Sequence, residues 1–238
     1  MPEDRLHQPA APKPEVPREL AEVVRAGVKA ARLVPGAVAV GGTVCALYAT
    51  HRLSFDIDFV VGDLRGRFDD VRDALEAESG WSLGRVKPPV LILGSLDQVP
   101  IGYRQLRRPA PLETLNLDTP DGVLPIPTLA ELLRIKAYLA ADRNATRDFL
   151  DLAELSLLLP RAEVVEALEA LDAKWSSAAR PGVALEVLKT LADCQPADDP
   201  SEVFGRLRVL KPRLTDWNQV RRVCRDISAE LSARLIGG

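Results

Sequence analysis

The sequence has 238 residues, 47% of them hydrophobic and 27% charged, and 31 basic against 34 acidic residues give a formal net charge of −3. This composition is typical of a globular protein with one or two domains, and it excludes a disulfide-stapled miniprotein and a polycationic nucleic-acid coat. The three cysteines form no CxxC pair, no apolar run reaches the roughly 18–20 residues that cross a bilayer, and the amino terminus lacks a signal-peptide pattern. We therefore expect a cytoplasmic protein with no membrane partner.

The first 18 residues predict a flexible tail. Five prolines stand among charged and small residues between positions 1 and 17, and such a segment cannot bury enough apolar surface to fold. An amphipathic helix follows, because Leu20, Val23, Val24 and Val28 fall on one helical face.

Residues 19–127 predict an α/β core, and residues 128–238 predict a helical domain. In the core, helices are expected at 43–50 and 67–79, and strands at 38–40, 55–61, 81–86, 90–93, 99–106, 112–117 and 123–126. In the helical part, a capping box from Thr128 to Glu131 opens a helix that runs through Leu139, and further helices are expected at 146–159, 162–175, 182–192, 201–207 and 217–235. The fold class is therefore α/β (α+β).

Two aspartates in the strand at 55–61 carry the clearest chemical signal. Alternation puts Asp56 and Asp58 on one face of the strand and Phe55, Ile57 and Phe59 on the other. Two carboxylates side by side repel each other unless a divalent cation lies between them. Although a lone D-x-D pair is more often two solvated strand residues, acids within so apolar a strand favour a Mg²⁺ site.

A glycine turn precedes these aspartates by twelve residues. Gly41 and Gly42 let backbone N–H groups approach phosphate oxygens, and the helix beginning at Thr43 adds its positive amino-terminal end. A lone Gly-Gly pair is usually only a turn, but together with Asp56 and Asp58 it predicts a site for a metal-bound nucleoside triphosphate, in which Gly41, Gly42 and Thr43 receive the triphosphate.

These residues resemble a known family. The Gly-Gly-Thr at 41–43 followed by His-Arg-Leu-Ser-Phe-Asp-Ile-Asp-Phe at 51–59 is similar to the first motif of polymerase-β-type nucleotidyltransferases, in particular the AbiEii/AbiGii toxin branch. A second block, Lys136, Arg143 and the Arg-Asp-Phe-Leu-Asp-Leu at 147–152, resembles that family's helical signature. The resemblance covers about residues 20–160.

The resemblance implies a mixed-sheet polymerase-β-like nucleotidyltransferase core, Mg²⁺ or Mn²⁺ as cofactor and an NTP as substrate. It places the metal-binding aspartates at Asp56 and Asp58, a catalytic lysine at Lys136 and a helical aspartate at Asp151. From the residues themselves, Lys136 has a long cationic stem suited to a triphosphate, and Asp151 could orient it or an incoming base. The alternatives are a solvated helix lysine and an acid that balances the helix dipole.

Three further positions bear on the predicted site. Arg52 and Ser54 are expected to support the loop before the metal strand, and Arg52 either pairs with Asp56 or Asp58, contacts phosphate, or makes a structural salt bridge. His51 is adjacent but has no partner nucleophile, and so it does not indicate a catalytic triad.

A third carboxylate often completes such a site. Asp97 and Asp118 are the visible candidates for it, although Asp97 has equally the context of a turn residue.

Basic residues indicate a nucleic-acid acceptor. Arginines cluster beside Tyr103 at 104, 107 and 108, others stand at 143 and 147, and the carboxy-terminal helices carry Lys211, Arg213, Arg221, Arg222 and Arg225. An RNA acceptor needs such contacts to its backbone, whereas the alternative is a set of solvated helix faces. The resemblance implies nucleotide transfer to RNA, at the 3′ end of tRNA, by the toxin of a toxin–antitoxin pair with a cognate antitoxin protein as partner. Two other functions stay open, a small-molecule nucleotidyltransferase of the antibiotic-modifying kind and a catalytically silent binding module.

Overall fold

The computed structural model describes residues 13–177 and 180–236. Of the predicted tail, residues 1–12 lie outside this range. The last residues of the predicted tail are packed on the protein. The Glu15 backbone N–H donates to the Leu47 carbonyl at 2.9 Å, and Val16 lies against the core.

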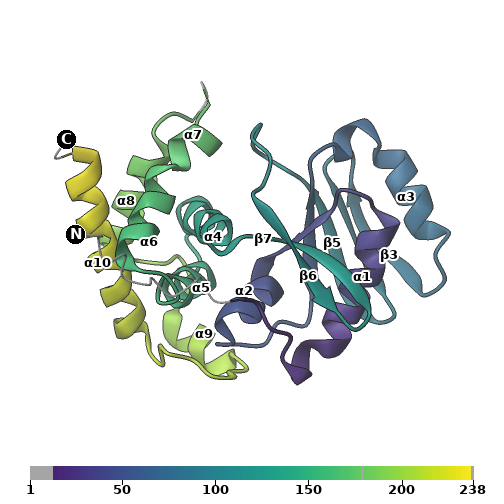
Figure 1. Cartoon of the computed structure of the whole chain (residues 1–238), viewed down its shortest axis with the longest axis horizontal. Helices are drawn as coiled ribbons and strands as arrows, with labels where there is room; N and C mark the ends of the chain where they lie inside the picture. The colour runs from purple at the N-terminus through teal and green to yellow at the C-terminus, as the bar shows by residue number, and fades with distance from the viewer. Residues whose placement is uncertain (1–12, 178–179, 237–238) are drawn as a thin grey trace, which may run out of the picture.

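The amino-terminal half is the expected α/β core (Figure 1). After a 3-10 helix, η1 (Arg18–Leu20), its elements are α1 (Ala21–Leu33), β1 (Val38–Val40), α2 (Gly41–Ala49), β2 (Ile57–Val61), η2 (Leu64–Gly66), α3 (Phe68–Glu76), β3 (Trp81–Lys87), β4 (Leu91–Leu96), β5 (Val99–Gln105), β6 (Thr114–Thr119) and β7 (Gly122–Pro127).

The sheet is mixed, as the fold class requires. Its strand order is β1-β2-β5-β4-β3, with β2 parallel to β5 and the other neighbours antiparallel. The hairpin of β6 and β7 forms a separate two-stranded sheet that packs against β1 and α1. This topology puts β2, the strand of the predicted metal site, in the interior of the larger sheet between β1 and β5.

The carboxy-terminal half is helical, as predicted. Its elements are α4 (Leu129–Arg143), α5 (Thr146–Ser156), α6 (Arg161–Glu169), α7 (Leu171–Trp175), α8 (Val183–Asp193), α9 (Pro200–Arg206) and α10 (Trp217–Ile236). Figure 1 shows these helices gathered on one side of the molecule, with α5 next to α2, and α2 and α5 are in contact. That contact joins the two halves at the site. No helix in the described part of the chain combines the length and apolarity needed to span a membrane.

The strand predicted to carry both aspartates is shorter than expected and contains only Asp58. It begins at Ile57, and alternation holds from there, with Ile57, Phe59 and Val61 buried and Asp58 half-buried. The expectation that Phe55 shares a face with Ile57 and Phe59 is wrong, because those two residues are buried and Phe55 is 46% exposed. The reason is that the chain up to residue 56 is a loop, so the period of two does not apply to it.

Two helix predictions need correction. The Thr128 hydroxyl accepts the Glu131 N–H at 3.3 Å, but Glu131 does not complete the capping box, because its buried carboxylate pairs with Arg108 and Arg134. The single helix expected at 162–175 is two helices, α6 and α7, which are separated at Ala170.

Candidate active site

A cavity of about 350 Å³ lies where the core meets the helical part. Side chains and backbone from the start of α2, the loop at 52–56, β2, the end of β5, α4, the start of α5 and α7 line it. Its charged residues are Arg52, Asp56, Asp58, Arg104, Arg107, Lys136, Arg143, Arg147 and Asp148. Basic side chains therefore outnumber acidic ones by two to one at this site.

The two predicted metal-binding aspartates both line the cavity. Asp56 accepts a hydrogen bond from the Ser54 hydroxyl at 2.7 Å, and Asp58 lies 3.4 Å from Arg104, Oδ1 to Nε. Burial raises the pKa of Asp58, Arg104 opposes the increase, and the neighbouring charge of Asp56 adds to it. Asp58 is thus a carboxylate whose negative charge the protein itself compensates only in part.

The donor set fits a magnesium ion that keeps some of its water. Carboxylate oxygens are the ligands that Mg²⁺ prefers, and one or two of them together with substrate phosphates are sufficient. Neither candidate third carboxylate reaches the cavity. Asp97 lies in the turn between β4 and β5 and pairs with Lys29 at 3.1 Å, and Asp118 is exposed on β6. Within residues 13–177 and 180–236, no group of three His, Cys, Asp or Glu side chains could hold a metal ion.

The glycine turn is placed beside the aspartates. Gly41 has a φ of +86° and begins α2, and a Cβ on Gly42 would lie 2.7 Å from Arg52 Nη2 and 2.8 Å from Ser54 Oγ. Both glycines line the cavity. Thr43 does not, because its fully buried hydroxyl donates to the Asp56 carbonyl at 2.5 Å. The Thr43 side chain therefore supports the backbone of the metal-site loop, and the contact of Thr43 with the triphosphate stays a prediction.

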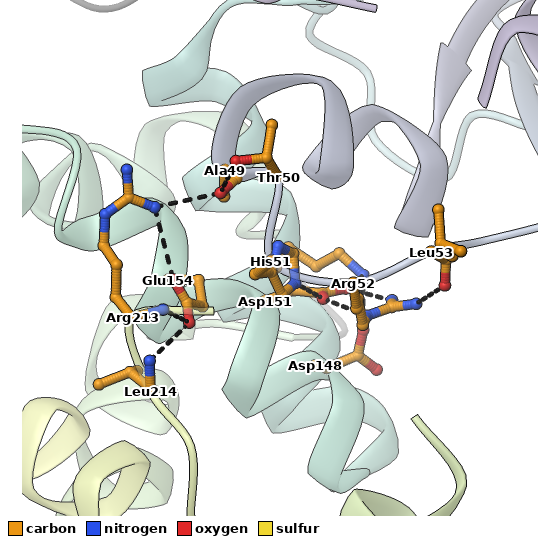
Figure 2. Close-up of polar contacts among 11 residues, drawn as sticks. Ala49, Thr50, His51, Arg52, Leu53, Asp148, Asp151, Glu154, Arg213 and Leu214 are labelled. Atoms are coloured by element: carbon orange, nitrogen blue, oxygen red, sulfur yellow. Dashed lines mark hydrogen bonds and ion pairs between the residues drawn. The ribbon is translucent and has the colours of Figure 1, made fainter. Parts of the chain in front are cut away.

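Asp151 is fully buried behind the cavity and holds three cationic or hydrogen-donating side chains. Figure 2 shows it between His51 and Arg52. It accepts from His51 Nε2 at 2.7 Å, from Arg52 Nε and Nη2 at 2.8 Å each, and from Lys136 Nζ at 2.8 Å. Burial alone would raise its pKa, but the charges of Arg52 and Lys136 and the bond from His51 hold the pKa of Asp151 well below its ordinary value.

This arrangement bears on the alternatives left open for Arg52. Its guanidinium is bidentate to Asp151 and does not pair with Asp56 or Asp58. The structural salt bridge, one of the alternatives at the sequence level, is what the fold contains. Arg52 also lines the cavity, as Ser54 and Asp56 do, and its Nη1 donates to the Leu53 carbonyl at 3.5 Å.

Lys136 extends from α4 into the network. Its ammonium lies 3.0 Å from Asp148 Oδ1 and 2.8 Å from Asp151 Oδ2, and its side chain is 5% exposed. Burial would lower its pKa, but Asp151 and Asp148 raise it above the ordinary lysine value. The two carboxylates therefore favour the charged form of the lysine, and Lys136 lines the cavity while Asp151 does not.

Three features of the site were missed at the sequence level. Asp148 pairs with Lys136 in addition to standing in the first turn of α5, and His51 has a partner, Asp151, one hundred residues away. The third is an apolar wall made with Tyr138 and Trp175, whose rings stack at 5.5 Å. No local pattern marks any of them, because each depends on contacts between distant segments.

The predicted basic cluster is divided by the fold. Arg104, Arg107, Arg143 and Arg147 line the cavity, but Arg108 is buried, pairs with Glu131 at 2.6 Å and lies 4.0 Å over the Trp175 ring. The basic residues predicted in the carboxy-terminal segment do not line it. Among them, Arg213 bonds to the Ala49 carbonyl and Arg225 to that of Ala192.

The mixed sheet and the helix that begins at Gly41-Gly42, with Asp58 on β2 and Asp56 just before it, form a fold that a solved nucleotidyltransferase shares. Among solved structures the chain is similar to MenT4, a nucleotidyltransferase toxin from Mycobacterium tuberculosis, with a TM-score of 0.53 over 91% of this chain and 86% of that chain. The two sequences are 16% identical, so the likeness concerns the fold.

Sequence relatives among curated proteins are much longer than this chain. It is 35% identical over 133 residues to the heme uptake protein MmpL11 of Mycobacterium tuberculosis, which is 55% of this chain and 13% of that protein. It is 30% identical over 171 residues to the mycolic acid-containing lipids exporter MmpL11 of Mycolicibacterium smegmatis, 70% of this chain and 15% of that protein. No protein-family model matches the sequence.

Proposed function

We propose that the protein is a metal-dependent nucleotidyltransferase, an enzyme that moves a nucleoside monophosphate from an NTP to an acceptor hydroxyl and releases pyrophosphate. The observation that carries this proposal is the placement of Asp56 and Asp58 in one cavity with the Gly41-Gly42 turn and six basic side chains. A bound Mg²⁺ or Mn²⁺ ion supplies activation of the hydroxyl and neutralises phosphate charge.

Each group then has a defined task in the proposal. Asp56 and Asp58 hold the metal, and the backbone at Gly41 and Gly42 allows a phosphate to approach the amino terminus of α2. Lys136 sets a fixed positive charge at the cavity wall, and Asp151 acts through it as a positioning residue. Ser54 orients Asp56 by its hydrogen bond.

RNA is the proposed acceptor. The cavity is lined by more basic than acidic residues, and a basic cleft favours a polyanionic acceptor such as RNA. A cationic antibiotic would instead be favoured by an acidic cleft. In support, the AbiEii/AbiGii resemblance implies transfer to the 3′ end of tRNA by a toxin with a protein antitoxin, and MenT4 is itself named a nucleotidyltransferase toxin. A cytoplasmic location is part of the same proposal.

A transfer assay tests the proposal. We expect the purified full-length protein, given an α-labelled NTP, tRNA and Mg²⁺, to incorporate label into RNA with one pyrophosphate released per label. Chelation of the metal should stop the reaction. Label confined to small molecules would favour the antibiotic-modifying alternative, and a lack of Mg²⁺-dependent NTP binding in calorimetry would favour a silent binding module.

Gly102 offers an indirect test of the metal site. It pairs with Asp58 across β2 and β5, and a Cβ there would clash with Asp58 Oδ1. We expect Gly102→Ala to push the carboxylate away and to weaken metal affinity about 10- to 100-fold, as changes beside a ligand do. The measurement is the Mg²⁺ concentration at half-maximal rate. Gly66→Ala is the matched control, because nothing lies within 4 Å of its Cβ position, and an equal shift in both variants would contradict the assignment.

A further inference from the structure

A second hollow of about 250 Å³ adjoins the candidate active site. It shares Arg52, Ser54, Asp56 and Arg147 with the larger cavity. Its other lining residues are Leu53, Phe55, Arg206, Leu207 and Arg208. We call these nine residues the Phe55 groove. The groove and the cavity meet at Asp56, so a ligand along the groove ends beside the proposed metal site.

Phe55 is unusual among the phenylalanines of this chain. Its side chain is 46% exposed, whereas the other four are buried or packed against the core. The guanidinium carbon of Arg208 lies 4.9 Å from the centre of its ring. An exposed aromatic ring next to Asp56 leaves apolar surface in water without stabilising the core, and a ligand that packs on the ring would cover that surface.

The groove is built from two segments held in register. The backbone N–H of Leu53 donates to the Arg208 carbonyl at 2.7 Å, that of Leu210 to His51 at 3.0 Å, and that of Lys211 to Thr50 at 2.8 Å. These bonds fix residues 208–211 against the loop that carries Asp56. The ring of Phe55 and the side chain of Arg208 therefore form part of one ordered surface beside the site.

The charge of the groove is strongly positive. Besides Arg52 it has three arginines, Arg147, Arg206 and Arg208, against the single carboxylate of Asp56. Arg206 pairs with Glu202 at 3.2 Å in an exposed i, i+4 bridge, but within the described residues Arg147 and Arg208 make no ion pair. Unpaired arginines around an aromatic ring match a phosphate backbone with bases that stack.

We propose that the Phe55 groove binds the single-stranded 3′-terminal segment of a nucleic-acid acceptor and delivers its terminal hydroxyl to Asp56. A base stacks on Phe55, and Arg147, Arg206 and Arg208 contact backbone phosphates. This inference rests on the proposed function for its last step, the approach of the hydroxyl to the metal site, but the binding step does not require it. A base-paired end does not suit the groove, because only an unpaired base exposes its face for stacking.

Binding of a defined oligonucleotide tests the groove independently of catalysis. The probe is a 3′-unpaired, 5′-fluorescein-labelled single-stranded RNA of twelve nucleotides, titrated with the full chain without NTP and followed by fluorescence anisotropy. We expect Phe55→Ala to weaken binding about 5- to 150-fold, the range that loss of one stacked base gives. Phe55→Leu keeps most of the bulk of the side chain but has no aromatic face, and it should also weaken binding. Phe55→Tyr keeps the aromatic ring and should bind as tightly as the wild type.

The role of Arg208 is tested through the salt dependence of oligonucleotide binding. Arg208→Ala should reduce the slope of log K against log salt by about one unit, as loss of one phosphate contact does. The matched control is Arg221→Ala on α10, which lies outside the groove and should leave the slope unchanged. The proposal is overturned if Phe55→Ala and Arg208→Ala bind like Arg221→Ala, or if a blunt duplex or an acidic peptide binds as tightly as the single strand.

A failure of the proposed function would have a different signature. One outcome is that no acceptor is labelled, but the oligonucleotide still binds and Phe55→Ala still weakens that binding. This result would support the groove as a binding site and contradict the transferase proposal. The opposite outcome is that label is transferred to RNA, but the acceptor KM is the same in the wild type and in Phe55→Ala. This result would support the transferase proposal and contradict acceptor binding in the Phe55 groove.

Discussion

Asp58→Asn is expected to reduce nucleotide transfer by at least about 10²- to 10³-fold, the loss that removal of one preorganised charge-stabilising group gives. Asn keeps the shape of the side chain but removes the negative charge that the metal needs. Among the residues that the structure describes, the half-buried carboxylate forms an ion pair only with Arg104, at 3.4 Å. The readout is kcat with saturating NTP, measured over a range of Mg²⁺ concentrations.

The same variant makes a prediction about stability that separates a functional from a structural aspartate. Because the pKa of Asp58 is raised in the folded protein, first by burial, the ionised carboxylate at neutral pH destabilises the fold. Asp58→Asn is therefore expected to have the same Tm as the wild type or a higher one. In the wild type Mg²⁺ with NTP should raise the Tm, and in the variant this increase should be lost.

Asp118→Asn is the matched control for this experiment. Asp118 is exposed on β6 and away from the cavity, so its replacement should change neither kcat nor the Mg²⁺ dependence. An equal loss in the two variants, or full activity of Asp58→Asn, would contradict the assignment of the metal site to β2.

Local patterns predicted most of the fold. The alternation in β2 and the 3.6-residue period of the helices are properties of neighbouring residues, and they identified Val38–Val40, Ile57–Val61 and the change to helix after Pro127. Alternation was extended too far, to Phe55, because the sequence does not mark where the loop ends and the strand begins. The break at Ala170 between α6 and α7 was not predicted, because no glycine or proline marks it in the sequence.

The site was predictable only where its residues are close in sequence. Gly41, Gly42, Asp56 and Asp58 stand within the continuous segment from α2 to β2 and line one cavity, but their roles remain predictions. The pairing of Asp151 with Arg52 could not be foreseen, because it depends on how α5 packs against α2. The exposure of Phe55 beside Arg208 could not be foreseen either, since those two residues belong to different halves of the chain.

Asp151→Ala is expected to be among the most destabilising single changes in the molecule. The carboxylate is fully buried and accepts bonds from His51, Arg52 and Lys136. Removing the carboxylate takes away a buried partner of the Arg52 guanidinium and of the Lys136 ammonium. Removing one partner of a buried ion pair costs about 3–5 kcal/mol. For a chain of this size that corresponds to a Tm lower by about 6–20 °C.

The control and the pH dependence make this prediction specific. Asp121→Ala removes only an exposed pair with Arg25 and should change the free energy of unfolding by less than about 1 kcal/mol. Because the pKa of Asp151 is lowered in the folded state, its contribution is complete above the unfolded value of about 3.9 and is lost as the pH falls through the folded pKa. Urea unfolding should therefore show a gap between wild type and Asp151→Asn that is constant above pH 5 and narrows below pH 4. A gap that widens toward acid pH would mean that His51, Arg52 and Lys136 are not what stabilises the ionised carboxylate.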